Sequence, residues 1–214
     1  KGTVWAGSDD GRIHVTRDAG ATWTSVEKAL PAGAPKNGAV AAIEPSRHDA
    51  ATAFAVLDDH RWGDFAPYVY RTDDFGKTWR SLVTPAVKGY ALAIVQDPVK
   101  KELLFLGTET GLYASLDGGK AWIPLRKAIP TASVMDLVIH PKEGDLVIAT
   151  HGRALWVLDD LTPLREMTEE AFGKPLQLFT PPPARQYSQA PMDGTGGAGA
   201  ADYAALPWPA PTIL

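Results

Sequence analysis

The chain has 214 residues, a formal net charge of −4 and no cysteine. This length allows one or two domains with a buried core. The lack of cysteine excludes disulfide scaffolds and thiolate metal sites, and a mild negative charge without a basic stripe argues against nucleic acid as a partner. No apolar run reaches the roughly 18 residues that span a bilayer, so no membrane span is predicted.

Short strand-like runs fill residues 1–160, where helical periodicity is nearly absent. They group into four repeats, predicted as 3–8, 12–16 and 22–26; 39–44, 52–57, 68–72 and 78–83; 90–95, 102–107, 111–116 and 121–125; and 134–140, 145–150 and 154–158. The first repeat lacks an innermost strand. Because the chain begins at Lys1 inside a strand-like run, we expect it to be a fragment or a processed piece.

An eight-residue pattern joins the last two strands of three repeats, at intervals of roughly 40 to 55 residues. It has Ser or Thr, Asp and Gly at its first, third and fifth positions and Trp at its eighth. Its members are Thr16, Asp18, Gly20 and Trp23; Thr72, Asp74, Gly76 and Trp79; and Ser115, Asp117, Gly119 and Trp122. The carboxylate can accept backbone N–H groups of its own turn, the glycine permits a positive φ, and the tryptophan can cover the turn. The pattern therefore predicts a structural turn rather than a reaction site.

The C-terminal part has a different composition. Thr162, Pro163 and Gly173 predict a short helix near 163–171, with Thr162 as N-cap and Gly173 beyond the end. Residues 176–179 are predicted to add a strand. The expected division is therefore 1–162 for the repeats, 163–180 for the helix and a closing strand, and 181–214 for a Pro/Gly-rich extension or linker.

The turns between the second and third strands of each repeat lie at the end opposite the eight-residue pattern, and loops on a rigid scaffold commonly carry binding groups. The candidate ligand-binding residues in these turns are Asp10, Arg12, Asp59, His60, Arg61, Trp62, His151 and Arg153. Arg12 and Arg153 can hold a carboxylate, a sugar acid or a phosphate in forked geometry, or they can join neighbouring repeats through salt bridges.

The long turn after residue 57 has further alternatives. Asp58, Asp59 and Asp64 can supply a carboxylate pair for glycoside hydrolysis or form a solvated turn; adjacent Asp58 and Asp59 point to opposite faces if extended. Trp62 and Phe65 can form a stacking platform or a protein-contact anchor, or can fold back as a small core of the loop.

Residue types and spacing give little support for a metal site, a cofactor or nucleophilic catalysis. His60 and His151 lack metal-ligand spacing, so we expect no metal and no cofactor. The chain has no GxSxG, no phosphate-cradling loop and no nucleophile–base pair, and its catalytic residues remain unknown. Trp5 and Trp156 lie within predicted strands and are expected in the core.

The three eight-residue turns resemble the Asp box, or BNR repeat, of β-propeller blades in sialidases, xyloglucan-active glycoside hydrolases and sortilin-type receptors. Residues 139–146 and 150–160 resemble the last blade of large bacterial sortilin-like propeller proteins, which are often labelled glycosyl hydrolases. The likeness covers most of the chain. It implies an all-β fold, a β-propeller with a partial set of about four four-stranded blades plus a C-terminal extension. The arginine triad of sialidases cannot be placed.

The resemblance implies a recognition scaffold that binds protein, peptide or glycan through the turns between strands two and three. The alternative is part of a glycoside hydrolase acting on polysaccharide, with carboxylates shared with blades absent from this chain. The remaining blades, from missing N-terminal sequence, another chain or a second copy, are the expected partners, with a glycan or protein ligand and no nucleic acid. The resemblance also implies a secreted or periplasmic location.

Overall fold

The computed structural model describes residues 2–36, 38–168, 171 and 174–181. The chain divides into two compact units, Lys1–Phe179 and Thr180–Leu214, and the fold below belongs to the first. Gly173 and most of the predicted Pro/Gly-rich extension, residues 182–214, lie outside the described part of the chain.

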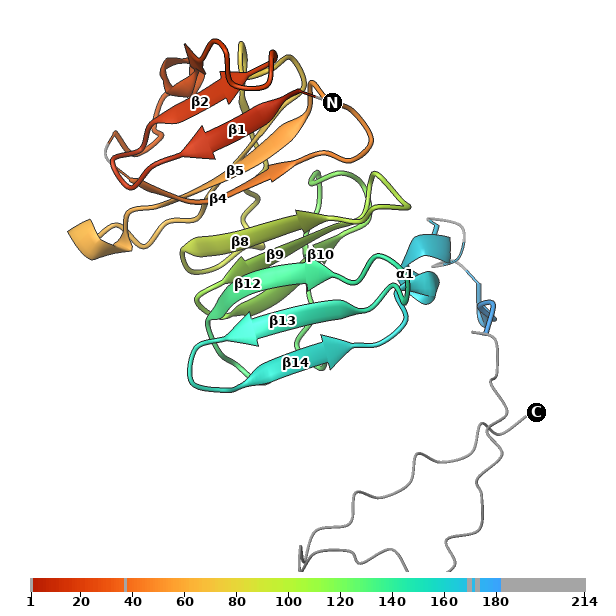
Figure 1. Ribbon diagram of the computed structural model, residues 1–214. Helices are drawn as coiled ribbons and strands as arrows, with labels where there is room; N and C mark the ends of the chain where they lie inside the picture. Colours follow the sequence, from red (N-terminus) through yellow and green to blue (C-terminus); the bar gives the residue numbers. More distant parts are fainter. Residues whose placement is uncertain (1, 37, 169–170, 172–173, 182–214) are drawn as a thin grey trace, which may run out of the picture. The chain divides into compact units, whose positions relative to one another are not determined.

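Four antiparallel sheets, here called the first to fourth sheets, follow one another along the chain (Figure 1). Their strands are β1 (Val4–Gly7), β2 (Ile13–Thr16) and β3 (Thr24–Ser25); β4 (Ala39–Pro45), β5 (Ala53–Asp58), β6 (Tyr68–Thr72) and β7 (Arg80–Ser81); β8 (Ala91–Gln96), β9 (Leu104–Thr108), β10 (Gly111–Ser115) and β11 (Ile123–Pro124); and β12 (Val134–Ile139), β13 (Leu146–Thr150) and β14 (Leu155–Leu158). Within each sheet, strands that are consecutive in sequence are paired. The predicted all-β propeller architecture is confirmed.

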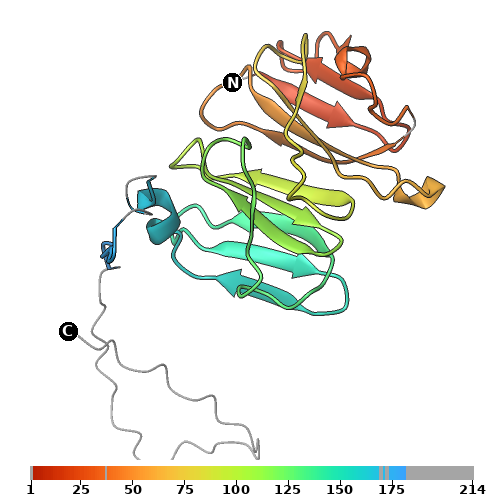
Figure 2. The same ribbon diagram turned by 180° about the vertical axis from the view of Figure 1, so that it is seen from behind.

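The sheets pack face to face, and their inner strands β4, β8 and β12 lie next to one another (Figure 2). Each inner strand carries a register irregularity near its start, and such a bulge increases local twist. Three apolar clusters fill the spaces between consecutive sheets. The apolar residues that alternate along the strands therefore pack between neighbouring sheets and hold them as a fan around the inner strands.

The three eight-residue patterns form one recurrent turn, at residues 16–23, 72–79 and 115–122. In the second copy, the Thr72 hydroxyl donates to Asp74 at 2.8 Å and accepts the N–H of Gly76 at 2.8 Å. Asp74 also accepts the N–H and the hydroxyl of Thr78, at 2.9 and 2.6 Å. The first copy has the same bonds. In the third copy Ala121 supplies only its N–H, because it has no hydroxyl.

The tryptophans of the recurrent turns pack against the preceding sheet rather than over their own turn. Trp79 is 7% exposed and shares a cluster with Val26, the residue after β3. Trp122 is 4% exposed and donates its indole N–H to the carbonyl of Leu82, the residue after β7, at 2.8 Å. Trp23, which has no preceding sheet in this structure, is 46% exposed.

The glycine of the turn permits this close packing. Gly76 has a φ of +80°, and a Cβ on it would lie 2.8 Å from the Val26 side chain. Any larger residue would therefore be strained in its backbone and would push the two sheets apart. The outer strands β3, β7 and β11 have two residues each, fewer than the sequence predicts, because the residues before them belong to the turn.

The predicted helix begins and ends earlier than the sequence indicates. Helix α1 spans Thr162–Glu166, and Thr162 is its first residue rather than its N-cap. The N-cap is Leu161, and the Asp160 carboxylate accepts the N–H of Thr162 at 3.0 Å, which gives one unpaired N–H of the first turn a partner. Extended backbone at Met167 ends the helix. The strand predicted at 176–179 is wrong, since the described residues 174–181 form no strand.

Helix α1 is fixed to the third sheet by a buried ion pair. The Nε and Nη2 atoms of Arg165 donate to one carboxylate oxygen of Asp97, at 3.0 and 2.8 Å, and Asp97 is fully buried. Lys100 Nζ donates to the carbonyls of Leu164 and Met167, at 3.3 and 2.7 Å. These bonds satisfy carbonyls at the C-terminal end of the helix that have no partner within it.

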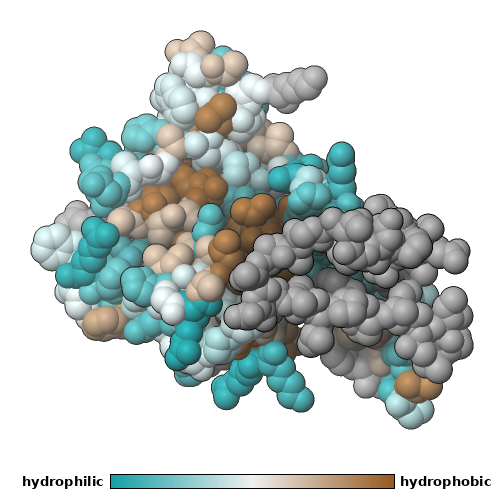
Figure 3. All heavy atoms as spheres, turned by 60° about the horizontal axis from the view of Figure 1, so that its bottom comes forward, coloured by the Kyte–Doolittle hydropathy of each residue, from teal (hydrophilic) through white to brown (hydrophobic). Residues whose placement is uncertain are grey.

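The outer face of the fourth sheet is apolar and uncovered among the described residues. Val138, Val147 and Val157 lie opposite one another across β12, β13 and β14. Val138 and Val157 are exposed, as are Leu155 and Met135. Figure 3, which brings the lower side of Figure 1 forward, shows apolar side chains gathered on the surface. A sheet face of this composition is commonly covered by another element.

Candidate ligand-binding face

The turns that join β1 to β2, β5 to β6, β9 to β10 and β13 to β14 share one end of the fan, opposite the recurrent turns. They cover residues 8–12, 58–67 (with Asp58 as the last residue of β5), 109–110 and 151–154. The connections into the inner strands reach the same end, since Glu109 N–H donates to Tyr90 carbonyl and His151 N–H donates to Ser133 carbonyl, both at 2.9 Å. These turns and connections form what we call the loop face.

A stacked ring pair lies on the loop face between the second and third sheets. The ring of His60 lies 4.3 Å from the ring of Tyr90 with an interplanar angle of 12°, and Phe65 lies 6.2 Å from Tyr90. The Nδ1 atom of His60 lies 2.7 and 2.6 Å from the two carboxylate oxygens of Asp58. The carboxylate therefore fixes the orientation of the imidazole against the tyrosine.

Beside this pair, the 58–67 turn presents two aromatic side chains to solvent. A short 3₁₀ helix, η2 (His60–Trp62), ends at Gly63, whose φ of 88° reverses the chain. Trp62 is 81% exposed and Phe65 is 57% exposed. The alternative in which they form a small core of the loop therefore does not fit the structure.

Carboxylates control the ionisation of the nearby tyrosines. The Tyr68 hydroxyl donates to Asp64 at 2.7 Å, which raises the pKa of Tyr68 to about 12 and lowers the pKa of Asp64. Burial, and then the charges of Glu109 and Asp58, raise the pKa of Tyr90. Both hydroxyls are therefore protonated at neutral pH. The Tyr68 proton is used in its bond to Asp64, so the Tyr90 hydroxyl is the one that can donate a hydrogen bond to a ligand.

The first sheet contributes a self-contained ion pair. Arg12 Nε lies 3.1 Å from Asp10, and both side chains are mostly exposed. The Ser8 hydroxyl also donates to Asp10; this bond, followed by the charge of Arg12, lowers the pKa of Asp10. Arg12 is thus paired within its own turn and does not join neighbouring sheets.

The remaining predicted residues are dispersed over the face. His151 and Arg153 are exposed on the fourth sheet, where the Arg153 carbonyl accepts the indole N–H of Trp156 at 2.7 Å. Among the residues described, the Arg153 guanidinium has no ion pair. Arg61 is exposed, and Asp59 is half-buried with its carbonyl accepting the N–H of Trp62. Of the predicted set, only His60 joins a cluster that spans two sheets.

Sequence reasoning missed Tyr90 and Ser133, and it placed Glu109 in a turn of the third repeat without naming it as a candidate. The Ser133 hydroxyl donates to the Glu109 carbonyl at 3.1 Å and links the third and fourth sheets at the loop face. The prediction considered only turns within each repeat, whereas Tyr90 and Ser133 lie in connections between repeats. Those connections begin every inner strand at the same end, so the repeat pattern itself contained the signal.

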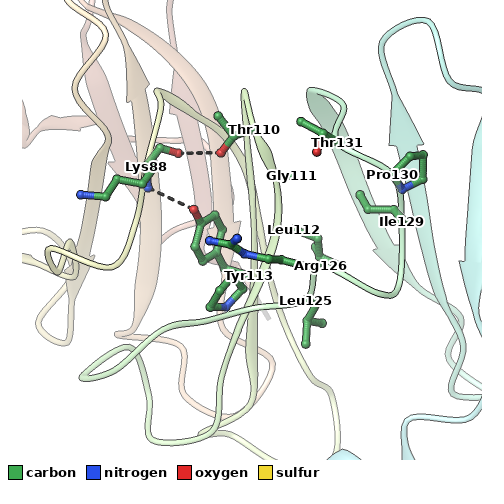
Figure 4. Close-up of a pocket in the computed structure, with 11 residues that line it drawn as sticks. Lys88, Thr110, Gly111, Leu112, Tyr113, Leu125, Arg126, Ile129, Pro130 and Thr131 are labelled. Atoms are coloured by element: carbon green, nitrogen blue, oxygen red, sulfur yellow. Dashed lines mark hydrogen bonds between the residues drawn. The ribbon is translucent and has the colours of Figure 1, made fainter.

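A cavity of about 290 Å³ opens on the third sheet, between β10 and the connection that follows β11 (Figure 4). Its lining includes Thr110, Tyr113, Arg126 and Ile129. The backbone N–H of Lys88 donates to the Tyr113 hydroxyl at 3.2 Å, and the Thr110 hydroxyl donates to the Lys88 carbonyl at 3.1 Å. The cavity is large enough for one side chain or a small polar group.

The part of the chain that the structure describes contains no cluster of three or more His, Asp or Glu side chains arranged to hold a metal ion. It also contains no helix that is long and apolar enough to cross a membrane.

The four antiparallel sheets, packed around adjacent inner strands, define a β-propeller scaffold. No protein-family model matches the chain. The chain is similar to the vacuolar protein sorting/targeting protein 10 of Laccaria bicolor (strain S238N-H82 / ATCC MYA-4686), with 35% identity over 109 residues. The matched region is 49% of this chain and 6% of that protein.

Solved propeller structures resemble the fold. YCF48 bound to D1 peptide matches with a TM-score of 0.53 and 17% identity, over 73% of this chain and 47% of that chain. The GH74 xyloglucanase of Xanthomonas campestris matches with a TM-score of 0.55 and 20% identity, over 75% of this chain and 26% of that chain. A chain of a nidogen/laminin complex matches with a TM-score of 0.55 and 15% identity, over 74% of this chain and 56% of that chain. At these identities the similarity shows the fold alone.

Proposed function

We propose that the chain is a recognition scaffold that binds a protein, peptide or glycan through its loop face. The observation that supports this proposal most is the 58–67 turn, where Trp62 and Phe65 are exposed beside the stacked rings of His60 and Tyr90. Exposed aromatic side chains on a rigid support bury large apolar area with little loss of conformational freedom. Ordered hydroxyls and carboxylates around them provide directional hydrogen bonds.

The comparisons support this proposal at the level of the scaffold. One propeller of similar fold was solved with a bound peptide, and another was solved in a nidogen/laminin complex. The curated relative is a sorting and targeting protein. By analogy, a peptide segment of a protein partner is the ligand that we place first, with a glycan second.

Hydrolysis of polysaccharide is the alternative function. It requires one carboxyl group as acid and another as base or nucleophile, separated by about 5 to 10 Å. At the loop face Asp58 contacts the His60 ring, Asp64 accepts the Tyr68 hydroxyl, and Asp10 is paired with Arg12. These three carboxylates are thus engaged locally, and recognition is the function that the geometry favours.

We further propose that the recurrent turns are Asp boxes of the BNR-repeat type with a structural role. Their carboxylates are saturated by donors of the same turn. Further blades of a complete propeller are the proposed neighbours of the first and fourth sheets, because Trp23 and the apolar face around Val157 are exposed there.

The test is a peptide and glycan binding screen on the full chain, followed by variants. The double variant Trp62→Ala with Phe65→Ala is expected to bind the tightest ligand of the screen at least tenfold more weakly. Each aromatic side chain buried by the ligand contributes about 1.5 kcal/mol or more to the binding free energy. Trp23→Ala, which removes an exposed tryptophan at the opposite end, is the matched control and should leave the affinity unchanged. Equal affinity of the double variant and the parent would refute the proposal.

A further inference from the structure

The second and third sheets each place a tryptophan against the sheet before them, and the fourth sheet lacks this contact among the described residues. Trp79 packs beside Val26, and Trp122 packs beside Leu82. In both cases the tryptophan of one sheet contacts the residue that follows the outer strand of the sheet before it. After β11 this position is Leu125. The fourth sheet has no fourth strand and no recurrent turn, so no tryptophan of the described residues reaches Leu125.

A groove of about 600 Å³ lies at this position, between residues 124–128 and 158–164. Leu125 and Leu158 line it and are only partly buried, although both pack against the cluster between the third and fourth sheets. Leu161 is fully buried, and Leu164 packs beside it. These leucines occupy part of the space that a tryptophan fills elsewhere, and the remaining groove is large enough for an aromatic side chain.

The edge of β14 beside the groove also lacks a partner in the described chain. Tyr70, Tyr113 and Trp156 hold matching places in the third strands of their sheets, opposite Ala55, Leu106 and Ile148. Tyr70 and Tyr113 are paired with an outer strand and are 4% and 5% exposed, whereas Trp156 is 38% exposed. The expectation that Trp156 is a core residue was therefore wrong, because the strand that would cover it is missing.

We propose that this groove and edge form an acceptor site for an extended peptide segment of another polypeptide that carries a tryptophan. The segment would add to β14 as a fourth antiparallel strand and insert its indole beside Leu125, as Trp122 does beside Leu82. Main-chain hydrogen bonds to the free edge supply affinity, and the groove supplies selectivity for the aromatic side chain. Arg126 and Lys127 on one wall and Asp159 on the other accommodate polar flanking residues.

The probe is a fluorescein-labelled peptide with the sequence of residues 74–83, DFGKTWRSLV, which is the chain's own turn and outer strand. Its binding to the full chain is followed by fluorescence anisotropy. We expect saturable binding, at least tenfold weaker for the peptide with alanine in place of its tryptophan. Amide hydrogen exchange of β14 should slow when the peptide is bound.

The matched protein variants are Ala128→Trp, which fills the groove from a half-buried position, and Ala50→Trp, which places the same side chain on an exposed turn. Ala128→Trp should lower the affinity for the peptide at least tenfold and leave the melting temperature of the protein unchanged. Ala50→Trp should bind the peptide with the affinity of the parent. No saturable binding, equal binding by Ala128→Trp, or protection that excludes β14 would overturn the proposal.

Discussion

At the scale of single residues, identical motif positions have different energetic roles because their surroundings differ. Trp23 and Trp79 each end a recurrent turn with the same local sequence pattern. Trp79 is enclosed between the first and second sheets and meets Trp5 edge-on at 5.9 Å, while Trp23 remains exposed. Neighbouring sheets, rather than the motif, therefore determine how much each tryptophan stabilises the fold.

Trp79→Ala should lower the free energy of unfolding by about 3 to 5 kcal/mol, the usual loss for a large buried aromatic. Trp23→Ala should lower it by less than about 1 kcal/mol, because much of its surface is already in water. Denaturant unfolding of both variants measures the difference. Equal losses would show that the tryptophan acts within its own turn.

The recurrent turns also make stability depend on pH. Hydrogen bonds from the hydroxyl and N–H of Thr78, followed by the Thr72 hydroxyl, lower the pKa of Asp74, and the Thr16 and Thr22 hydroxyls lower that of Asp18. A carboxyl whose folded pKa lies below its unfolded value stabilises the fold above the unfolded pKa of about 3.9. That stabilisation is lost as the pH falls through the folded pKa.

The melting temperature should therefore fall as the pH is lowered from about 5 towards 2. Asp74→Asn should melt lower at neutral pH and show a shallower decrease on acidification, because the ionised form no longer contributes. Thermal unfolding across this range measures both slopes. Parallel curves for the variant and the parent would contradict the assigned role of the carboxylate.

At the scale of elements, helix α1 depends on one buried ion pair more than on its own length. It has five residues, too few to be stable alone. Its hold on the third sheet comes from Arg165 with Asp97 and from Lys100 with the carbonyls of Leu164 and Met167.

Arg165→Met should destabilise the first unit by about 3 kcal/mol, because it leaves the fully buried Asp97 carboxylate without its guanidinium. Amide exchange in residues 162–167 should become faster in this variant. Arg12→Ala, which breaks an exposed ion pair, is the control and should cause no measurable change. Unaltered exchange in α1 would show that the ion pair does not hold the helix, and that Lys100 and the packing of Leu161 are enough.

The elements differ in how far the sequence predicts them. Alternating apolar residues identified all four sheets, and the repeated Asp and Gly marked three of them, because both signals are local. The outer strands were predicted too long, since Trp79 and Trp122 look like strand residues but insert into the preceding sheet. The stacking of His60 on Tyr90 joins two repeats and depends on how the sheets pack, which no local pattern contains.

At the scale of the whole molecule, the fourth sheet has an apolar face around Val138, Val157 and Leu155 that no described residue covers. The equivalent face of the third sheet is covered by Leu137, Ile139 and Ile148 of the fourth. A further sheet of a complete propeller is the cover that this repetition predicts.

In the absence of such a cover, the isolated chain should self-associate through this face. Sedimentation velocity at increasing protein concentration should show assembly, and Val138→Lys with Val157→Lys should reduce it, because buried lysines oppose contact. Leu176→Lys, at an exposed position outside the sheets, is the control. A chain that remains monomeric at all concentrations would contradict the prediction.

The central claim is that ligands bind at the loop face and that the recurrent turns only support the fold. Chemical-shift mapping of the full chain with its tightest-binding peptide or glycan tests this most directly. The account predicts perturbed amides in residues 58–67, near Tyr90 and near Glu109. Perturbation concentrated in residues 16–23, 72–79 and 115–122, with an unchanged loop face, would contradict it.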